Sequence, residues 1–339
     1  MPPKKYDWAR LSKNELLKVR LCDLGLSYKG TWIEERIDRF VYHLELRHVR
    51  VKPHFWISDE WLTPDGVIGI AVPFFLIHPR LMKLERQEML GVEGGTREHC
   101  MMLLRHEMGH VVRNAYQLQR RPSWRKLFGS ATKRYPESYR PNPTSKRFVQ
   151  HLDGWYAQSH PDEDFAETFA VWLKSRAMWR KKYQNWHALK KLEYIDSLMK
   201  ELEHRPLQIH SRAKPFAISK ISMTLGEYYA AKRAHYAADY PDTYDGDLQR
   251  LFQPSEARKI GESAVQFLRR NRTHIREMVC HWTGEYQFTL DQVIKGMMQR
   301  CHQLKLRAVG NEQRLAMDCA ILVTVHSMHT LYRRDWRPL

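Results

Sequence analysis

The sequence of 339 residues has no closely spaced cysteines and no long apolar run. Its cysteines are few, odd in number and far apart, at Cys22, Cys100, Cys280, Cys301 and Cys319. This excludes a CxxC zinc ribbon and argues against a disulfide framework. No run of 18 apolar residues occurs, and the N-terminus lacks the apolar core of a signal peptide. We therefore expect free thiols, no membrane span and a cytoplasmic location.

Acidic residues are scarce compared with basic ones. There are 38 Asp and Glu against 56 Lys and Arg, which gives a formal net charge of +18. Between Arg120 and Arg147 nine basic residues accompany the single acid Glu137, with aromatic residues among them. Such a stretch is typical of a solvated loop, but it can also bind phosphate groups. The charge thus leaves open an acidic partner or nucleic acid, bound through the basic segment 120–147.

One motif carries clear chemistry, His106-Glu107-Met108-Gly109-His110, which has the pattern HExxH. Residues four apart share one face of a helix, so both histidines can bind one metal ion while Glu107 points toward a water on that ion. Catalytic zinc bound by two histidines needs a third protein ligand and one open position. Glycine inside this helix costs about 1 kcal/mol relative to alanine, which predicts a close neighbour at Gly109.

The segment 159–170 offers the third ligand, because Glu163 and Glu167 stand four apart on a predicted helix that starts near Pro161. We expect Glu163 to bind the metal and Glu167 to accept the ring N–H of a ligating histidine. Alternatives remain: Asp164 is either a ligand or a solvated acid, and His160 either a ligand or the residue that closes the helix start. Glu167 is otherwise an ordinary surface acid.

These two motifs resemble those of the gluzincin metallopeptidases, in which HExxH is followed on a later helix by Glu-x-x-x-Asp/Glu. More narrowly, the sequence is similar to the bacterial putative zinc-binding metallopeptidases, with HExGH at 106–110, the pair Phe128-Gly129, and YAxxHPxEDxAExFA at 156–170. The resemblance covers roughly residues 60–200. It implies that Tyr156, seven residues before Glu163, polarises the scissile carbonyl. Without it, Tyr156 is simply an aromatic packing residue. The metzincin pattern is excluded, since it would need glycine and histidine at Arg113 and Tyr116.

The predicted activity is zinc-dependent hydrolysis of peptide amide bonds in a peptide or protein substrate. One zinc ion per chain would activate a water, Glu107 would act as general base, and Tyr156 or His160 would contact the oxyanion or the substrate. The alternative function is a non-catalytic or nucleic-acid-associated protein that keeps the zinc fold and binds through its basic surface.

We expect an α+β fold with a zincin-like domain at 51–204, an N-terminal helical segment at 1–50 and a helical region of unknown role at 205–339. Helices are predicted at 11–22, 32–47, from Thr96 to about Leu118, at 176–204 and at four places after residue 216, which are 224–238, 254–281, 288–307 and 311–333. Residues 54–57 and 67–72 flank the turn Thr63-Pro64-Asp65-Gly66, which predicts a hairpin. The segment 67–77 is placed to be an edge strand that pairs with the substrate backbone, although a buried sheet strand of no special function would have the same sequence pattern.

Overall fold

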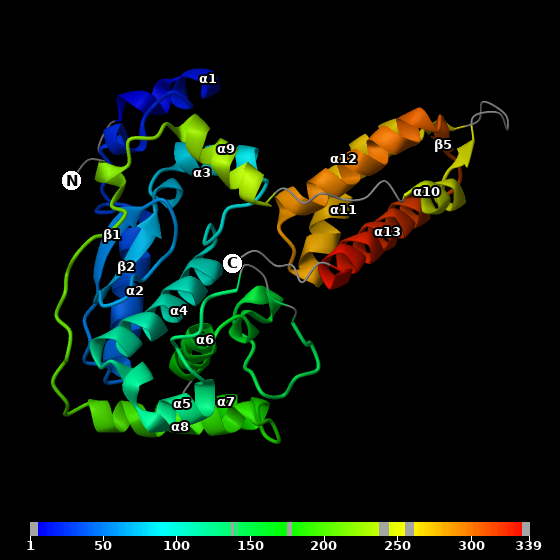
Figure 1. The fold of residues 1–339 in the computed structure, drawn as a ribbon. Helices are drawn as coiled ribbons and strands as arrows, with labels where there is room; N and C mark the ends of the chain where they lie inside the picture. Colours follow the sequence, from blue (N-terminus) through cyan, green and yellow to red (C-terminus); the bar gives the residue numbers. More distant parts are fainter. Residues whose placement is uncertain are drawn as a thin grey trace.

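A computed structural model describes residues 6–136, 139, 141–174, 178–236, 244–254 and 261–333. The chain forms a larger part and a smaller C-terminal part (Figure 1). Its buried apolar side chains form two main hydrophobic clusters. The larger gathers side chains from Trp8 to Tyr229 together with Phe288, and so it extends across both predicted boundaries, at residues 50 and 204. The smaller runs from Tyr244 to Val323.

The larger part and the C-terminal part each contain helices and strands, and helices predominate over strands. This agrees with the predicted α+β class. The larger part contains α1 (Lys13–Leu16), α2 (Trp32–Leu46), β1 (His54–Ser58), β2 (Gly69–Pro73), α3 (Pro79–Met89), α4 (Arg97–Ala115), α5 (Pro122–Phe128), α6 (Pro161–Lys174), α7 (Met178–Lys182), α8 (Ala188–Leu202) and α9 (Leu225–Tyr236). The C-terminal part contains α10 (Asp245–Leu251), β3 (Gln253–Pro254), β4 (Glu262–Ser263), α11 (Ala264–Thr283), α12 (Gln287–Gln303), β5 (Leu306–Ala308) and α13 (Glu312–Arg333).

The predicted hairpin is wrong, because β1 and β2 are parallel, with Trp56 opposite Ala71. The turn at 63–66 does reverse the chain, but it brings Leu62 antiparallel to Ala71, whose N–H donates to the Leu62 carbonyl over 2.9 Å. Strand β2 therefore lies between β1 and Leu62 and is buried along its whole length. It is not the open edge strand that was expected to pair with a substrate.

Two predicted helices are interrupted, each for a different reason. Residues 17–21 hydrogen-bond to 223–226, so the expected helix 11–22 is limited to α1 and a 3₁₀ turn at Leu21–Leu24. The expected helix 176–204 is divided into α7 and α8, and Asn185 between them has a left-handed φ of 67°. Residues 175–177 at its start lie outside the described part.

The C-terminal part is a helical bundle that projects from the rest of the molecule (Figure 1). Its helices α12 and α13 match the predictions 288–307 and 311–333, and the fourth prediction, 224–238, corresponds to α9 in the larger part. Helix α11 begins at Ala264 rather than near residue 254, and residues 255–260 lie outside the described part. Strands β3, β5 and β4 add a small antiparallel sheet with β5 in the middle, which was not predicted. The bundle contacts the larger part where Tyr286 packs on Tyr236, with ring centroids 4.3 Å apart.

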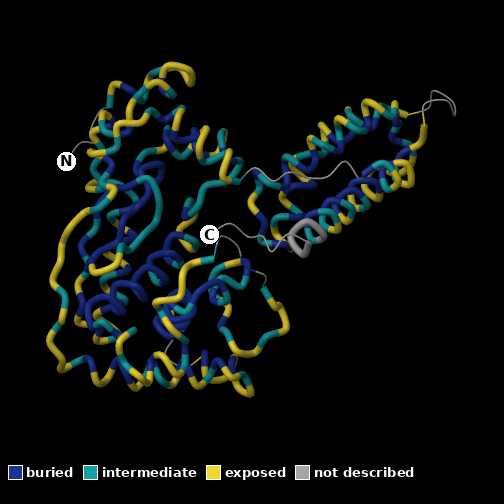
Figure 2. Tube along the Cα trace, in the orientation of Figure 1, coloured by how far each residue is buried: buried dark blue, intermediate teal, exposed yellow. Residues whose placement is uncertain are grey.

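Helices α4 and α6 lie at the centre of the larger part, where the backbone is almost entirely buried (Figure 2). Thr96 caps α4 by accepting a hydrogen bond from the His99 N–H, as its position before the helix predicts. Among the helices that the structure describes, none combines the length and apolarity needed to cross a lipid bilayer.

Candidate metal centre

Helix α4 carries the HExxH residues and packs unusually closely against α6. A Cβ atom added to Gly109 would lie 2.5 Å from the Ala166 Cα and 3.1 Å from its Cβ. The predicted close neighbour of Gly109 is therefore confirmed, and it is the backbone of the helix that carries Glu163. Glycine lets the two helices approach until side chains from both can meet at one point.

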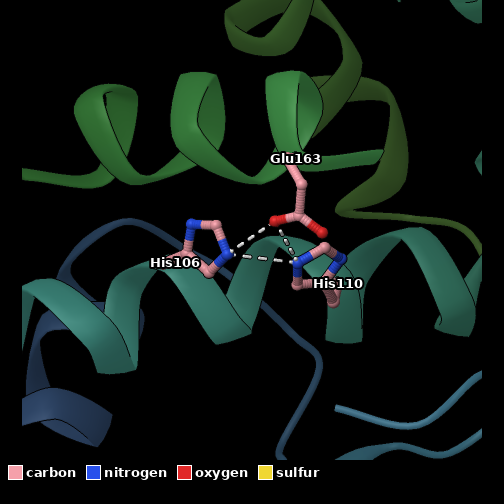
Figure 3. Close-up of side chains that lie close together, drawn as sticks. All are labelled: His106, His110 and Glu163. Atoms are coloured by element: carbon pink, nitrogen blue, oxygen red, sulfur yellow. Dashed lines mark hydrogen bonds and ion pairs between the residues drawn. The ribbon is translucent and has the colours of Figure 1, made fainter. Parts of the chain in front are cut away.

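Three side chains from these helices converge (Figure 3). The Glu163 Oε2 atom lies 3.0 Å from the His106 Nε2 and 3.3 Å from the His110 Nε2, and the two nitrogens are 3.2 Å apart. Ligands placed about 2.0 to 2.1 Å from a tetrahedral zinc ion are separated from one another by about 3.3 Å. The three atoms thus have the spacing of one face of a zinc coordination tetrahedron.

Glu167 fixes the orientation of His106. The His106 Nδ1–H donates to the Glu167 Oε1 over 2.8 Å, and the Leu152 N–H donates to the Oε2 over 2.8 Å. A carboxylate can only accept here, so Nδ1 carries a proton, and Nε2, which faces Glu163 and His110, is the nitrogen left to bind a metal ion. Glu167 is fully buried and lies where the predicted supporting carboxylate was expected.

Glu107 lies beside this group and is only 6% exposed. Its Oε2 atom is buried and has no hydrogen-bond partner among the described residues. Glu107, Glu163 and Glu167 place three buried carboxylates around two histidines. Buried negative charge needs compensation, and a divalent cation at the convergence point would supply it. The residues present therefore fit a zinc ion.

The local charges are strongly coupled to one another. Burial lowers the pKa of His106, but its hydrogen bonds with Glu163 and Glu167 outweigh burial and raise that pKa well above the ordinary value. Burial raises the pKa of Glu163, but the charges and hydrogen bonds of His110 and His106 outweigh it and hold that pKa well below the ordinary value. The raised pKa of His106 and the lowered pKa of Glu163 both show that the buried carboxylates of this site favour positive charge between them.

Tyr156 lies next to this group, with its ring centroid 5.6 Å from that of His106. It belongs to a 3₁₀ segment at Asp153–Gln158, in which Gly154 and Trp155 have left-handed φ values of 76° and 54°. Burial and the nearby charge of Glu163 raise the pKa of Tyr156 well above its ordinary value. Its hydroxyl therefore stays protonated and can donate a hydrogen bond.

The two alternative ligands have other partners. Asp164 is buried rather than solvated, and its Oδ2 atom accepts a hydrogen bond from the Lys191 Nζ over 2.6 Å. His160 closes the start of α6: its Nδ1 accepts from the Asp162 N–H over 3.2 Å, and its Nε2 donates to the Lys133 carbonyl over 2.8 Å. A contact of His160 with the substrate or the oxyanion, as predicted, would require one of these bonds to break.

Sequence reasoning missed Tyr135. Its hydroxyl donates to the Glu163 Oε1 over 2.8 Å, and its ring stacks on His160. In the sequence it is one of several aromatics in the basic segment 120–147, 28 residues before Glu163, and no motif distinguishes it. Within the described part of the chain, His106, His110 and Glu163 are the one group of three potential ligands close enough to hold a metal ion.

Comparison with protein families gives a match over residues 98–226 to the family described as putative zinc-binding metallo-peptidase. The matched range contains both motif helices and ends in α9. This confirms the family predicted from the motifs, although the range begins and ends later than residues 60–200. Neither the curated proteins nor the solved structures gave a match.

Proposed function

We propose that this chain, whose residues 98–226 belong to the putative zinc-binding metallo-peptidases, is a zinc-dependent peptidase with a gluzincin-type site. The proposed ligands are His106, His110 and Glu163, with Glu167 as the support for His106. One zinc ion per chain would occupy the site. A peptide or protein is the substrate that the family implies.

The observation that carries this proposal is the convergence of three ligand atoms beside an unpaired, buried Glu107 carboxylate. A purely structural zinc site is usually closed by four protein ligands and needs no general base. Here three ligands leave one coordination position for water or substrate. The arrangement of α4 and α6 also supports a zincin-like fold for this domain.

Zinc, when bound, would lower the pKa of a water molecule and polarise the carbonyl group of a peptide bond. Glu107 would accept the proton of the attacking water and then deliver it to the leaving amine. Tyr156, kept protonated by its surroundings, would donate a hydrogen bond to the oxygen that becomes negative.

The alternative function, nucleic-acid binding through the segment 120–147, is not favoured by the structure. Part of this segment contacts the proposed metal centre. The Tyr135 hydroxyl donates a hydrogen bond to Glu163, and the Lys133 carbonyl accepts one from His160. At its other end Arg121 pairs with Glu201 over 3.0 Å. These contacts give part of the segment a role in supporting the proposed site.

The first test is the metal content of untagged protein, measured by mass spectrometry for the native chain, Glu163→Ala and Asp164→Ala. We expect about one zinc ion per chain in the native protein and in Asp164→Ala, and its loss in Glu163→Ala. Asp164 is a matched control because it is an adjacent, equally buried acid on the same helix. No zinc in the native chain, even after zinc is supplied, would refute the proposal.

The second test concerns turnover. A peptide library is incubated with the zinc-loaded native protein and with Glu107→Gln, and cleavage products are identified by mass spectrometry. We expect Glu107→Gln to keep its zinc and to lose hydrolysis, because an amide cannot accept the proton. Equal cleavage by both proteins would show that Glu107 is not the general base.

A further inference from the structure

The two oxygens of Glu163 have different partners. The Oε2 atom faces the Nε2 atoms of His106 and His110, at 3.0 and 3.3 Å. The Oε1 atom instead accepts a hydrogen bond from the Tyr135 hydroxyl over 2.8 Å. A carboxylate can offer a metal ion one oxygen or both, and here one oxygen is already engaged.

Tyr135 is held in place by a second interaction. Its ring stacks on that of His160, with centroids 3.8 Å apart and an angle of 18° between the planes. His160 is itself fixed at both ring nitrogens, by the Lys133 carbonyl and the Asp162 N–H. Although Tyr135 is 43% exposed, its ring therefore lies on a buried and anchored partner.

Gly129 lies between α5 and Tyr135, beside the start of α6. This residue follows α5 with a φ of 108°, a backbone conformation that favours glycine. A Cβ atom there would lie 3.4 Å from the Pro161 Cγ, so the chain leaves α5 directly over the first residue of α6. In the pair Phe128-Gly129, the glycine thus allows the chain to turn where it passes the start of the glutamate helix.

We propose that Tyr135 is a positioning residue for the metal ion. Its hydrogen bond engages the Glu163 Oε1, so that Glu163 binds through Oε2 alone and a coordination position stays open. The inference rests on the metal site proposed above. It predicts that the hydroxyl of Tyr135 contributes to zinc affinity, whereas the hydroxyl of Tyr156 contributes to turnover.

The test compares Tyr135→Phe with Tyr156→Phe, each of which removes one hydroxyl and keeps the ring. Zinc affinity is measured by competition with a chromophoric chelator. Loss of a hydrogen bond to a ligating group typically costs 10-fold to 100-fold in metal affinity, and we expect a loss of about this size for Tyr135→Phe. Tyr156→Phe should bind zinc as the native chain does and hydrolyse peptides more slowly.

Two further measurements separate positioning from a general effect on folding. The metal-free form of Tyr135→Phe should still unfold in one cooperative transition, as the native chain does, because the stacked ring remains. The visible absorption of the cobalt-substituted proteins should differ, because a freed Oε1 changes the coordination of the metal. Tyr135→Leu, which also removes the ring, should weaken zinc binding at least as much.

Native zinc affinity in Tyr135→Phe, together with an unchanged cobalt spectrum, would overturn the inference and leave the proposed peptidase intact. A native chain that binds no zinc would instead overturn the proposed function. The two failures are therefore distinguishable in the same set of measurements.

Discussion

Replacing Gly109 by alanine tests the helix contact on which the proposed metal centre depends. The added Cβ would lie 2.5 Å from the Ala166 Cα, whereas carbon atoms in favourable contact are about 3.5 to 4.0 Å apart. Helix α6 would have to move by about 1 Å, since the obstacle is its backbone rather than a flexible side chain. Glu163, three residues before Ala166, would move with it.

The magnitude follows from two opposing effects. Overpacking a core costs about 1 to 3 kcal/mol, and a clash with backbone belongs at the upper end of that range. Alanine gains about 1 kcal/mol over glycine in the interior of a helix. We therefore expect Gly109→Ala to lower the free energy of unfolding by about 2 kcal/mol and to weaken zinc binding.

The assay is urea unfolding of the metal-free proteins, followed by zinc competition. Gly296→Ala is the matched control, because Gly296 lies within α12 and its added Cβ would meet only the Tyr244 ring, at an ordinary distance of 3.5 Å. That variant should be more stable by about 0.5 to 1 kcal/mol. If Gly109→Ala were as stable as the native chain and kept its zinc affinity, the reasoning about the contact of α4 with α6 would be refuted.

Three other predictions concern support of the site, thiol reactivity and the C-terminal bundle. Glu167→Gln should weaken zinc binding about 10-fold to 100-fold, as measured by chelator competition. The reason is that one amide oxygen cannot accept from both the His106 and the Leu152 N–H groups. An unchanged affinity would contradict the role of Glu167 as the support for His106. Burial raises the pKa of Cys100, Cys301 and Cys319 to about 12. Iodoacetamide at pH 8 should therefore modify the more accessible Cys22 and leave these three thiols unmodified until the pH nears 12 or the protein unfolds. Peptide mapping would identify the modified cysteines. Gly284→Ala should slow peptide turnover, because its Cβ would lie 3.1 Å from the Asp153 Cβ, three residues before Tyr156. Gly30→Ala is the control for backbone strain, since Gly30 has a similar φ and its added Cβ would meet no atom within 4 Å. Equal turnover in the two variants would argue against a link between the bundle and the site.

The sequence predicts those features of the site that depend on neighbours along the chain. The four-residue spacings of His106 to His110 and of Glu163 to Glu167 place each pair on one helix face, whatever the rest of the chain does. The start of α4 after Thr96 and of α6 at Pro161 follow from capping preferences that act within one turn. The close contact at Gly109 could be predicted because glycine destabilises a helix interior, so its presence there indicates a neighbour that leaves no room for a side chain.

Other features depend on partners far away in the sequence. The composition of strand β2 does not indicate whether it pairs with β1 in a parallel or an antiparallel sense. In the structure it is parallel to β1, and the residue that pairs with it in the antiparallel sense is Leu62. Asp164 has the local pattern of a surface acid, but Lys191 on α8 lies beside it and allows it to be buried. Residues 17–21 have helical periodicity, yet their backbone pairs with residues 223–226.

For this protein, the sequence by itself determined which side chains form the proposed metal centre, since helical periodicity fixes which side chains share a face. It also predicted the family and most of the helices. Only the tertiary structure decided that α4 and α6 meet at Gly109, that Glu163 rather than Asp164 faces the histidines, and that Tyr135 bonds Glu163. These features rest on contacts between distant segments, whose geometry is set by packing and by the burial of charge rather than by local preference.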